Sequence, residues 1–468
     1  MNPEQTRQSV DRFWDQSIIP ALSKYIEIPN QSPLFDPDWK KNGHMDRAVA
    51  LAKQWVLDQK IPGSKVEVFE EPGKTPVLFV EVDGAIDKTV LLYGHLDKQP
   101  AMVGWEKGLS PWKPVLRDGK LYGRGAADDG YAVFGVVSAI RLLKEQKIEH
   151  PRLVVLIECC EESGSVDLPH YVNKLSARIG TPGLIVCLDS GCGNYDQLWA
   201  TTSLRGSVVG NLTAEMLSEG VHSGDASGIV ASTFRILRIL LDRLEDSKTG
   251  RIKPEWLWVT VPKDRKSEMK KAAKILKKET FDKFPFLKGV RPVSDDPMEL
   301  LLNRTWRPAL SITGQEGMPD LLQAGNVLRP KTSIKLSLRL PPTLDAGKAA
   351  KKLKKLLESD PPYGAKVTFD AEKGGTGWQA PLMAKWLEKS LEKSSKAYFG
   401  RGMSFIGEGG SIPFMGMLGE KFPKAQFLIT GVLGPHSNAH GPNEFLEIQT
   451  GKNISACVAQ VIEDYAKA

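Results

Sequence analysis

Histidines and acids that directly follow apolar segments are the residues of this 468-residue chain best suited to chemistry. His95 closes the segment Thr-Val-Leu-Leu-Tyr-Gly-His, and Asp97 follows two residues later. Residues two apart in an extended chain face the same side, so the Asp97 carboxylate can orient the His95 imidazole. Carboxylates support metal-ligating histidines in this way. The pair therefore indicates a metal ligand with its supporting acid.

Other acids and histidines follow apolar segments in the same manner: Asp128 and Asp129, Glu161 and Glu162, Asp189, and His436 and His440. Each alone has an ordinary explanation, such as a turn, a helix cap or a solvated pair. Together they place ligand-type side chains after five separate segments, and sites in open α/β sheets lie at the carboxyl ends of strands. Adjacent acids in a dry crevice repel each other, so a pair of metal ions is their natural counter-charge.

The apolar segments that precede these residues alternate with helical patterns. Strands are predicted at 77–82, 89–93, 153–157 and 184–188, and helices over 131–146 and around 48–56. Buried strands alternating with helices are typical of an α/β sheet covered on both faces. This predicts the fold class of the part of the chain that carries the chemistry.

The middle of the chain has a different pattern. Strand-like runs at 207–213, 309–313 and 333–340 accompany lysine-rich helical stretches at 263–283 and 348–355, which indicates an α+β domain. A helical pattern is predicted to resume near Trp378, followed by a buried strand at 425–430. We therefore expect a first domain of residues 1–204 and 378–468, interrupted by an inserted domain of residues 205–377.

Composition excludes several classes of protein. Hydrophobic residues make up 41% and charged residues 25%, close to globular averages. The net charge of +7 comes from the two lysine-rich stretches, which lack interleaved aromatic residues and are interpreted as solvated helix faces rather than a nucleic-acid site. The polar N-terminus and the absence of a long apolar run predict no signal peptide and no membrane span. Five cysteines without a zinc-finger spacing predict reduced thiols and a cytoplasmic protein.

Several motifs together resemble the M20 family of di-metal exopeptidases and deacylases, and most closely its carnosinase-like dipeptidase branch. The motifs occur in family order over nearly the whole chain: Gly-His-Leu-Asp-Lys-Gln-Pro from Gly94, Gly-Trp-Glu from Gly104, Asp-Gly-Lys-Leu-Tyr-Gly-Arg-Gly-Ala-Ala-Asp-Asp-Gly from Asp118, Glu-Glu-Ser-Gly-Ser from Glu161, His-Ser-Gly from His222, and His-Gly-Pro-Asn-Glu from His440. The resemblance implies a mixed sheet flanked by helices with an inserted lid.

The resemblance also implies roles for the ligand-type residues. His95 and Asp189 would bind one divalent metal, Glu162 and His440 the other, and Asp128 would bridge both. Asp97 would orient His95, and Glu161 would be the general base. The His-x-x-Asn-Glu pattern selects His440 over His436. Zinc suits such ligands, and manganese or cobalt also fit.

Residues outside the metal cluster would recognise the substrate. The resemblance implies that His222, on the lid, stabilises the oxyanion, often in the partner subunit of a homodimer formed through the lids. Arg339 would bind the substrate carboxylate, with help from Asn326 and from the loop of Gly409, Gly410 and Ser411. An arginine suits this role because its planar fork meets a carboxylate with two hydrogen bonds.

The function implied is hydrolysis of dipeptides or short peptides that bear a free C-terminal carboxylate, with a metal-bridging water as nucleophile and Glu161 as its base. An N-acyl-amino-acid deacylase would use the same site, and a metal-free binding protein or a nucleic-acid binder are further alternatives. The sequence has no Gly-x-Ser-x-Gly elbow and no Walker loop. Lys98, Gly130, Arg329 and Pro330 depart from the family pattern, which leaves the substrate range open.

Overall fold

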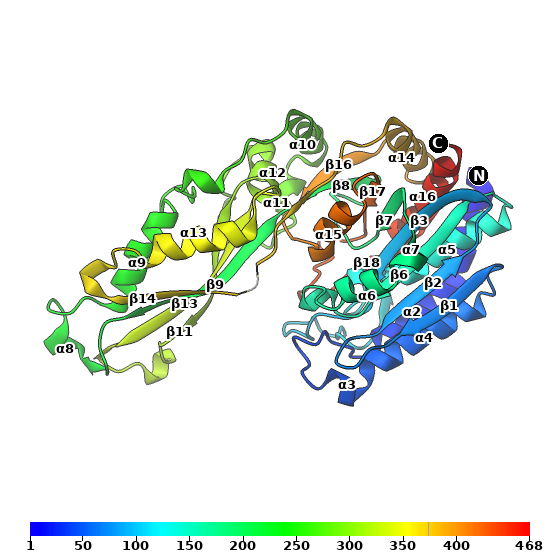
Figure 1. Cartoon of the computed structure of the whole chain (residues 1–468). Helices are drawn as coiled ribbons and strands as arrows, with labels where there is room; N and C mark the ends of the chain where they lie inside the picture. Colours follow the sequence, from blue (N-terminus) through cyan, green and yellow to red (C-terminus); the bar gives the residue numbers. More distant parts are fainter. Residues whose placement is uncertain (373) are drawn as a thin grey trace.

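The computed structural model describes residues 1–372 and 374–468 and contains two regions, each built on its own sheet (Figure 1). One region, here called the six-stranded region, holds both chain termini. The other, the four-stranded region, extends away from it and is formed by the middle of the chain. This division matters for function because ligand-type residues lie in both regions.

The six-stranded sheet is mixed and has the order β1-β2-β6-β3-β7-β17. Strands β6, β3, β7 and β17 are parallel, whereas β1 and β2 pair antiparallel at one edge. Its strands span Ser64–Phe69 (β1), Val77–Val82 (β2), Ile86–His95 (β3), Pro151–Glu158 (β6), Leu184–Cys187 (β7) and Gln426–Ile429 (β17). The parallel strands direct their carboxyl ends to one edge, where His95, Glu161 and Asp189 follow.

Apolar side chains alternate between the two faces of this sheet, as the two-residue strand period requires. Leu92 and Val155 belong to one buried core, and Leu91 and Val154 to the other. The first core is covered by the helices Pro3–Phe13 (α1), Ile19–Ile26 (α2), His44–Asp58 (α4), Tyr131–Glu145 (α5), Lys385–Tyr398 (α14) and Ile448–Lys467 (α16). The second is covered by Leu168–Lys174 (α6), Ser176–Ile179 (α7) and Pro413–Lys421 (α15). The short helix Trp39–Asn42 (α3) precedes α4.

The four-stranded sheet is antiparallel, with the order β11-β13-β9-β14. Its strands are Gly206–Glu215 (β9), Ala309–Glu316 (β11), Lys331–Leu340 (β13) and Lys366–Ala371 (β14). Helices Thr233–Leu244 (α9) and Ala346–Glu358 (α13) bury their apolar faces against one side of it. At its outer end lie β10 (Val221–His222), α8 (Ser223–Ala226) and β12 (Val327–Leu328) (Figure 1).

Short elements connect the two regions. Strand β8 (Trp199–Leu204) pairs with β15 (Trp378–Gln379) and β16 (Ser404–Glu408), and it leads directly into β9. Helices α10 (Lys263–Leu276) and α12 (Pro297–Thr305) pack on β8 and β16 through Met269 and Leu301, and α11 (Glu279–Asp282) lies between them in sequence. Part of the predicted insertion is therefore anchored beside the six-stranded region. A third small sheet joins β4 (Val115–Arg117), β5 (Lys120–Tyr122) and β18 (Phe445–Glu447).

The predicted α/β fold class is confirmed, and each predicted strand overlaps an observed one. The helical pattern predicted near Trp378 is wrong. Trp378 pairs with Leu204 in a short strand, and the helix begins only at Lys385, after Pro381. The lysine-rich stretch 263–283 is two helices rather than one, because Lys277 leaves the helical conformation with a φ of 47°.

All five cysteines are free and buried, as reduced thiols would be. A search of the described residues finds no helix with the length and apolar character to cross a membrane.

Candidate metal centre

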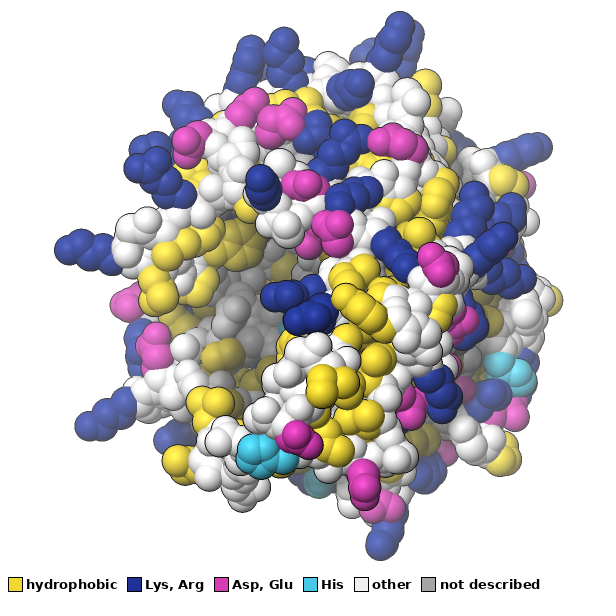
Figure 2. Space-filling view, turned by 90° about the vertical axis from the view of Figure 1, so that its left-hand side faces the viewer, with side chains coloured by type: hydrophobic (Ala, Val, Ile, Leu, Met, Phe, Trp, Pro, Cys, Tyr) yellow, Lys and Arg dark blue, Asp and Glu magenta, His cyan; other side chains and the backbone are white. Residues whose placement is uncertain are grey.

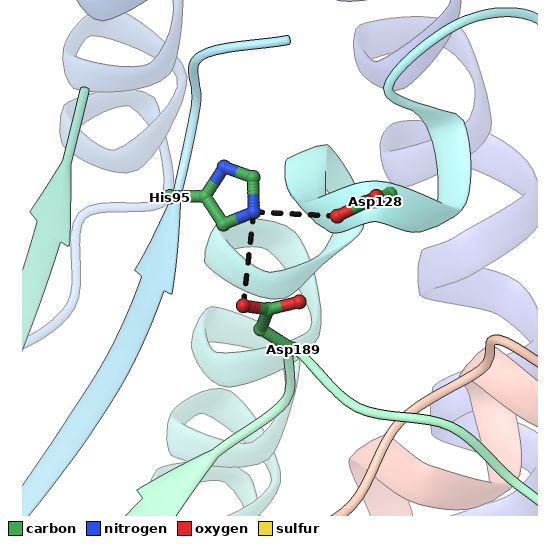
Figure 3. Close-up of side chains that lie close together, drawn as sticks. All are labelled: His95, Asp128 and Asp189. Atoms are coloured by element: carbon green, nitrogen blue, oxygen red, sulfur yellow. Dashed lines mark ion pairs between the residues drawn. The ribbon is translucent and has the colours of Figure 1, made fainter. Parts of the chain in front are cut away.

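His95 and Asp189 approach each other at the carboxyl ends of adjacent parallel strands. His95 is the last residue of β3, and Asp189 lies two residues beyond the end of β7. The His95 Nε2 atom lies 3.8 Å from Asp189 Oδ2 and 3.4 Å from Asp128 Oδ1 (Figure 3). These three side chains are buried and could hold one cation.

A second group of ligand atoms adjoins the first. His440 Nε2 lies 3.0 Å from Asp128 Oδ2 and 3.4 Å from Glu162 Oε2. Asp128 thus presents one carboxylate oxygen to each histidine, and its position between the two groups is that of a bridging ligand. His436 is not among the residues of either group, so the sequence-based choice of His440 agrees with this geometry.

Asp128 does not follow a strand of the main sheet, although the sequence analysis placed it after one. It follows β5 of the small three-stranded sheet, and the turn after Gly125 carries it to the site. Glu444 fixes this turn, because its Oε1 accepts hydrogen bonds from the N–H groups of Ala127 and Asp128 at 3.1 and 3.2 Å. Its other oxygen pairs with Arg124 at 2.6 Å. Sequence analysis quoted Glu444 within a motif but assigned it no role.

Asp97 connects the two groups of ligands. Its backbone carbonyl lies 3.1 Å from His95 Nδ1, and its Oδ1 lies 3.4 Å from the same nitrogen. Its two carboxylate oxygens also accept hydrogen bonds from the N–H groups of Glu161 and Glu162, both at 3.0 Å. The orienting role predicted for Asp97 therefore extends to the turn that carries the two glutamates.

Burial dominates the electrostatics of the site. It raises the pKa of Glu162 to about 8, with Asp128 adding to the shift, and it raises the pKa of Asp189 to about 6. Burial also raises the pKa of Glu161 well above its usual value, and the charge of Asp189 raises it further. Asp128 is the exception, because the neighbouring His440 and His95 outweigh burial and lower its pKa. Four acids thus lie close together, and their negative charges repel one another.

The residues fit a pair of divalent cations. His95 Nε2 is buried and has no hydrogen-bond partner among the described residues, although two carboxylates face it. A cation between these groups would give that nitrogen its missing partner and would let the acids ionise. Each group offers one imidazole nitrogen and two carboxylate oxygens, donors that divalent transition metals accept.

A cavity of about 180 Å³ opens beside these ligands. Asp128, Glu161, Asp189 and His440 line one side, and Gly410 and Ser411 line another. Glu408, which sequence analysis did not single out, also lines the cavity. Arg304 donates to its Oε2 at 2.7 Å, whereas its Oε1 is buried without a partner in the described part of the chain.

Arg339 lies on β13 at the end of the four-stranded sheet nearest to the six-stranded region. Its cross-strand neighbour on β9 is Ser207. Its half-buried guanidinium has no ion pair or hydrogen bond within residues 1–372 and 374–468, and burial lowers its pKa. Its charge contributes to lowering the pKa of Arg205, whose side chain contacts Gly409, so Arg339 and the Gly409–Ser411 loop lie in the same neighbourhood.

His222 and Asn326 are not brought to the cavity within this chain. Both are exposed at the outer end of the four-stranded region, close to α8 and far from the metal ligands (Figure 1). They are close to each other, because the N–H of Ser223 donates to the Asn326 carbonyl at 2.9 Å and His222 pairs with Val327. The structure thus separates the predicted site residues into a cluster and a distant pair.

Two adjoining groups of imidazoles and acids beside the carboxyl edge of a mixed α/β sheet have the arrangement of a candidate two-metal site. The chain belongs to peptidase family M20/M25/M40, whose sequence profile matches residues 91–464.

Named relatives share most of their length with this chain. It is 28% identical over 392 residues to a cysteinylglycine-S-conjugate dipeptidase of Corynebacterium striatum, an alignment that covers 81% of each protein. It is also 28% identical over 478 residues to the human Beta-Ala-His dipeptidase, covering 97% of this chain and 91% of that protein. The crystal structure of human carnosine dipeptidase 1 superposes with a TM-score of 0.80 at 24% identity, covering 100% of this chain and 99% of that one. The predicted resemblance to carnosinase-like dipeptidases is confirmed.

Proposed function

We propose that this protein hydrolyses the amide bond of dipeptides or short peptides with a free C-terminal carboxylate, using two zinc ions. The observation that carries the proposal is the pair of ligand groups that share Asp128, with Glu161 on the wall of the same cavity. Zinc is proposed because imidazole and carboxylate ligands suit it, with manganese or cobalt as alternatives. His95 and Asp189 would hold one ion, and Glu162 and His440 the other.

Two divalent ions bridged by a carboxylate lower the pKa of a water molecule and polarise a carbonyl group. The chain supplies the proton acceptor. Glu161 lines the cavity but is not in either group of ligand atoms, so its carboxylate is available as a base. It would take the proton of the attacking water and pass it to the leaving amine. Asp97 holds the backbone of Glu161 and the ring of His95, so it positions base and ligand together.

The cavity offers groups for both ends of a dipeptide. Gly410 and Ser411 line the cavity, and their N–H groups suit a carboxylate. Arg339 lies in the neighbourhood of this loop without a partner among the described residues, and its guanidinium would add to carboxylate binding. Glu408 suits a charged amine, because its buried Oε1 lacks a partner while Arg304 holds Oε2. A carboxylate at this place favours a free α-amino group over an acyl group, and this supports a dipeptidase over an N-acyl-amino-acid deacylase.

His222 and Asn326 would complete the site of a second copy of the chain. We propose residues 1–204 and 378–468 as the catalytic domain and 205–377 as the lid through which two copies associate. Support comes from the outer end of this region, where Figure 2 shows hydrophobic side chains gathered between basic ones. Ile229, Leu321 and Leu322 are among the exposed apolar residues there. A cytoplasmic location fits the five free cysteines.

The test is release of amino acids by protein stripped of metal and reloaded with zinc, manganese or cobalt. The substrate panel pairs free dipeptides with N-acetyl amino acids that have the same C-terminal residue. We expect release from dipeptides and the highest rate with zinc. Release from the acetylated compounds alone would identify the protein as a deacylase. No release from either class of substrate, with no metal bound, would contradict the proposal that the protein is an enzyme.

A further inference from the structure

Arg205 is a buried arginine at the junction of the two regions, between β8 and β9. Only 9% of the residue is exposed. Its Nε donates to the Gly409 carbonyl and its Nη1 to the Asn303 carbonyl, both at 3.1 Å. Gly409 belongs to the loop that lines the cavity, and Asn303 lies in the last turn of α12. A single side chain thus connects the cavity loop to a helix of the inserted segment.

The charge of Arg205 is held without an acidic partner among the described residues. Burial, together with the charges of the neighbouring Arg339 and Arg304, lowers its pKa to about 9, and the charge of Glu408 opposes this shift. The carboxyl end of α12 offsets part of this cost, because the carbonyl groups at a helix end carry partial negative charge. Arg304 is paired with Glu408, but Arg339 has no partner in residues 1–372 and 374–468. Neither Arg205 nor Arg339 therefore has a direct ion-pair partner in the part of the chain that the structure describes.

The hydrogen bond from Arg205 also sets the direction of a peptide group. In a trans peptide the carbonyl and the following N–H point in opposite directions, and the bond between Gly409 and Gly410 is trans. Because the Gly409 carbonyl points to Arg205, the Gly410 N–H points away from it. Neither this N–H nor that of Ser411 has an acceptor among the described residues, and both residues line the cavity.

We propose that Arg205 is a positioning residue for recognition of the substrate carboxylate. It holds the Gly409–Gly410 peptide so that the Gly410 N–H faces the cavity, and its charge adds to that of Arg339 in attracting the anion. Arg205 itself stays bound to the two carbonyl groups. The inference rests on the proposed function, since it concerns how that site distinguishes a free C-terminal carboxylate.

The experiment compares R205K with the wild type on a dipeptide and on the same dipeptide with a C-terminal amide. Lysine keeps the charge but cannot serve both carbonyl groups in the same geometry. We expect the ratio of kcat/KM for the acid over the amide to fall about tenfold, through KM, with kcat within about threefold of wild type.

The matched control is R265K. Arg265 is also a buried arginine that connects the inserted segment to the returning chain, through the Ala380 carbonyl at 2.8 Å, but within the described part of the chain it makes no hydrogen bond or ion pair with the cavity loop. Its variant should keep the wild-type ratio of acid to amide. An R205K enzyme with reduced activity but an unchanged ratio would overturn the proposal, because Arg205 would then only stabilise the junction.

A second variant tests the same orientation without touching Arg205. G410P removes the N–H that the Arg205 hydrogen bond directs to the cavity, and it should lower the acid-to-amide ratio as R205K does. An unchanged ratio in folded G410P would overturn the proposal. A wild-type enzyme that cleaves acid and amide equally would also overturn it, while leaving the proposed hydrolysis intact. If the wild type cleaves no peptide at all, the proposed function itself is contradicted.

Discussion

The two regions of the molecule differ in how complete their functional groups are. In the six-stranded region the ligand atoms of five residues converge within one chain, and backbone N–H groups and buried acids fix their positions. In the four-stranded region His222 and Asn326 are exposed and distant from the cavity, and Arg339 has no ion pair or hydrogen bond among the described residues. The candidate metal ligands are therefore gathered within a single chain, whereas the residues proposed to recognise the substrate are spread over both regions.

The largest effect should come from Glu161, because it tests the chemistry of the complete cluster. E161Q keeps the shape of the side chain and leaves all five ligands, so both metals should remain bound. Loss of the base should lower kcat by about 10³- to 10⁴-fold. Metal content measured by mass spectrometry, together with kcat, checks this. Loss of one metal ion would instead make Glu161 a ligand, and near-wild-type turnover would give the base another identity.

The next effect concerns the incomplete region. H222A should lower kcat by about 10²- to 10³-fold with metal content unchanged, because a donor to the developing oxyanion is lost. If His222 acts in the partner's site, a dimer of one E161Q and one H222A subunit contains one site with both residues intact. Such a mixed dimer should regain about half of the wild-type activity, since one of its two symmetric sites is complete.

Co-expression with two affinity tags isolates the mixed dimer for this assay. Recovery of activity would establish that one subunit completes the site of the other. If His222 acted on its own chain, each site of the mixed dimer would carry one defect and the dimer would stay inactive. Loss of metal from H222A would show that His222 is a ligand.

Arg339 should give a smaller effect that falls on binding. R339M removes a guanidinium that has no acidic partner in the described residues, so the folded protein loses no ion pair. We expect KM for dipeptides to rise about tenfold to a hundredfold, the range for a hydrogen bond to a charged group, with a smaller change in kcat. R238M is the control for loss of a guanidinium from the same region, since Arg238 lies on α9, which packs against the four-stranded sheet. Equal changes in both variants would contradict carboxylate binding by Arg339.

The difference between the regions also decides what the sequence could predict. His95, Asp128, Glu162, Asp189 and His440 could be named because each follows an apolar segment and the resemblance to a family gave each a role; the fold then brings them together. Arg205 could not be named in this way. Its role depends on the carbonyl groups of Gly409 and Asn303, which are remote in sequence and leave no pattern of residue types.

Glu158 shows the same limit within the six-stranded region. In the sequence Glu158 directly follows a predicted apolar strand. In the structure its side chain is buried and accepts hydrogen bonds from Tyr93 and Ser165. A single sequence cannot reveal that no cationic side chain in residues 1–372 and 374–468 pairs with Glu158, because pairing depends on what packs around the strand end. Its consequence is a dependence of stability on pH rather than a change in catalysis.

Burial raises the pKa of Glu158 from 4.5 to about 7. A raised pKa in the folded state favours folding below the unfolded pKa, and this contribution is lost as pH rises through the folded value. Metal-free protein should therefore lose about 3 kcal/mol of unfolding free energy between pH 5 and 8 through this group, and E158Q should not. The comparison is made by urea unfolding across that range.

E463Q is the matched control for Glu158, because the pKa shift of Glu463 has the opposite sign. Burial would raise the pKa of Glu463, but hydrogen bonds from Lys467 and the N-terminal ammonium group lower it to about 2. Its contribution is present above pH 4.5 and is lost only as pH falls toward 2. The difference between E463Q and wild type should thus stay constant from pH 5 to 8, where that of E158Q changes. If E158Q follows the pH profile of wild type, the pKa of Glu158 is the same in the folded and unfolded metal-free protein, and burial does not shift it.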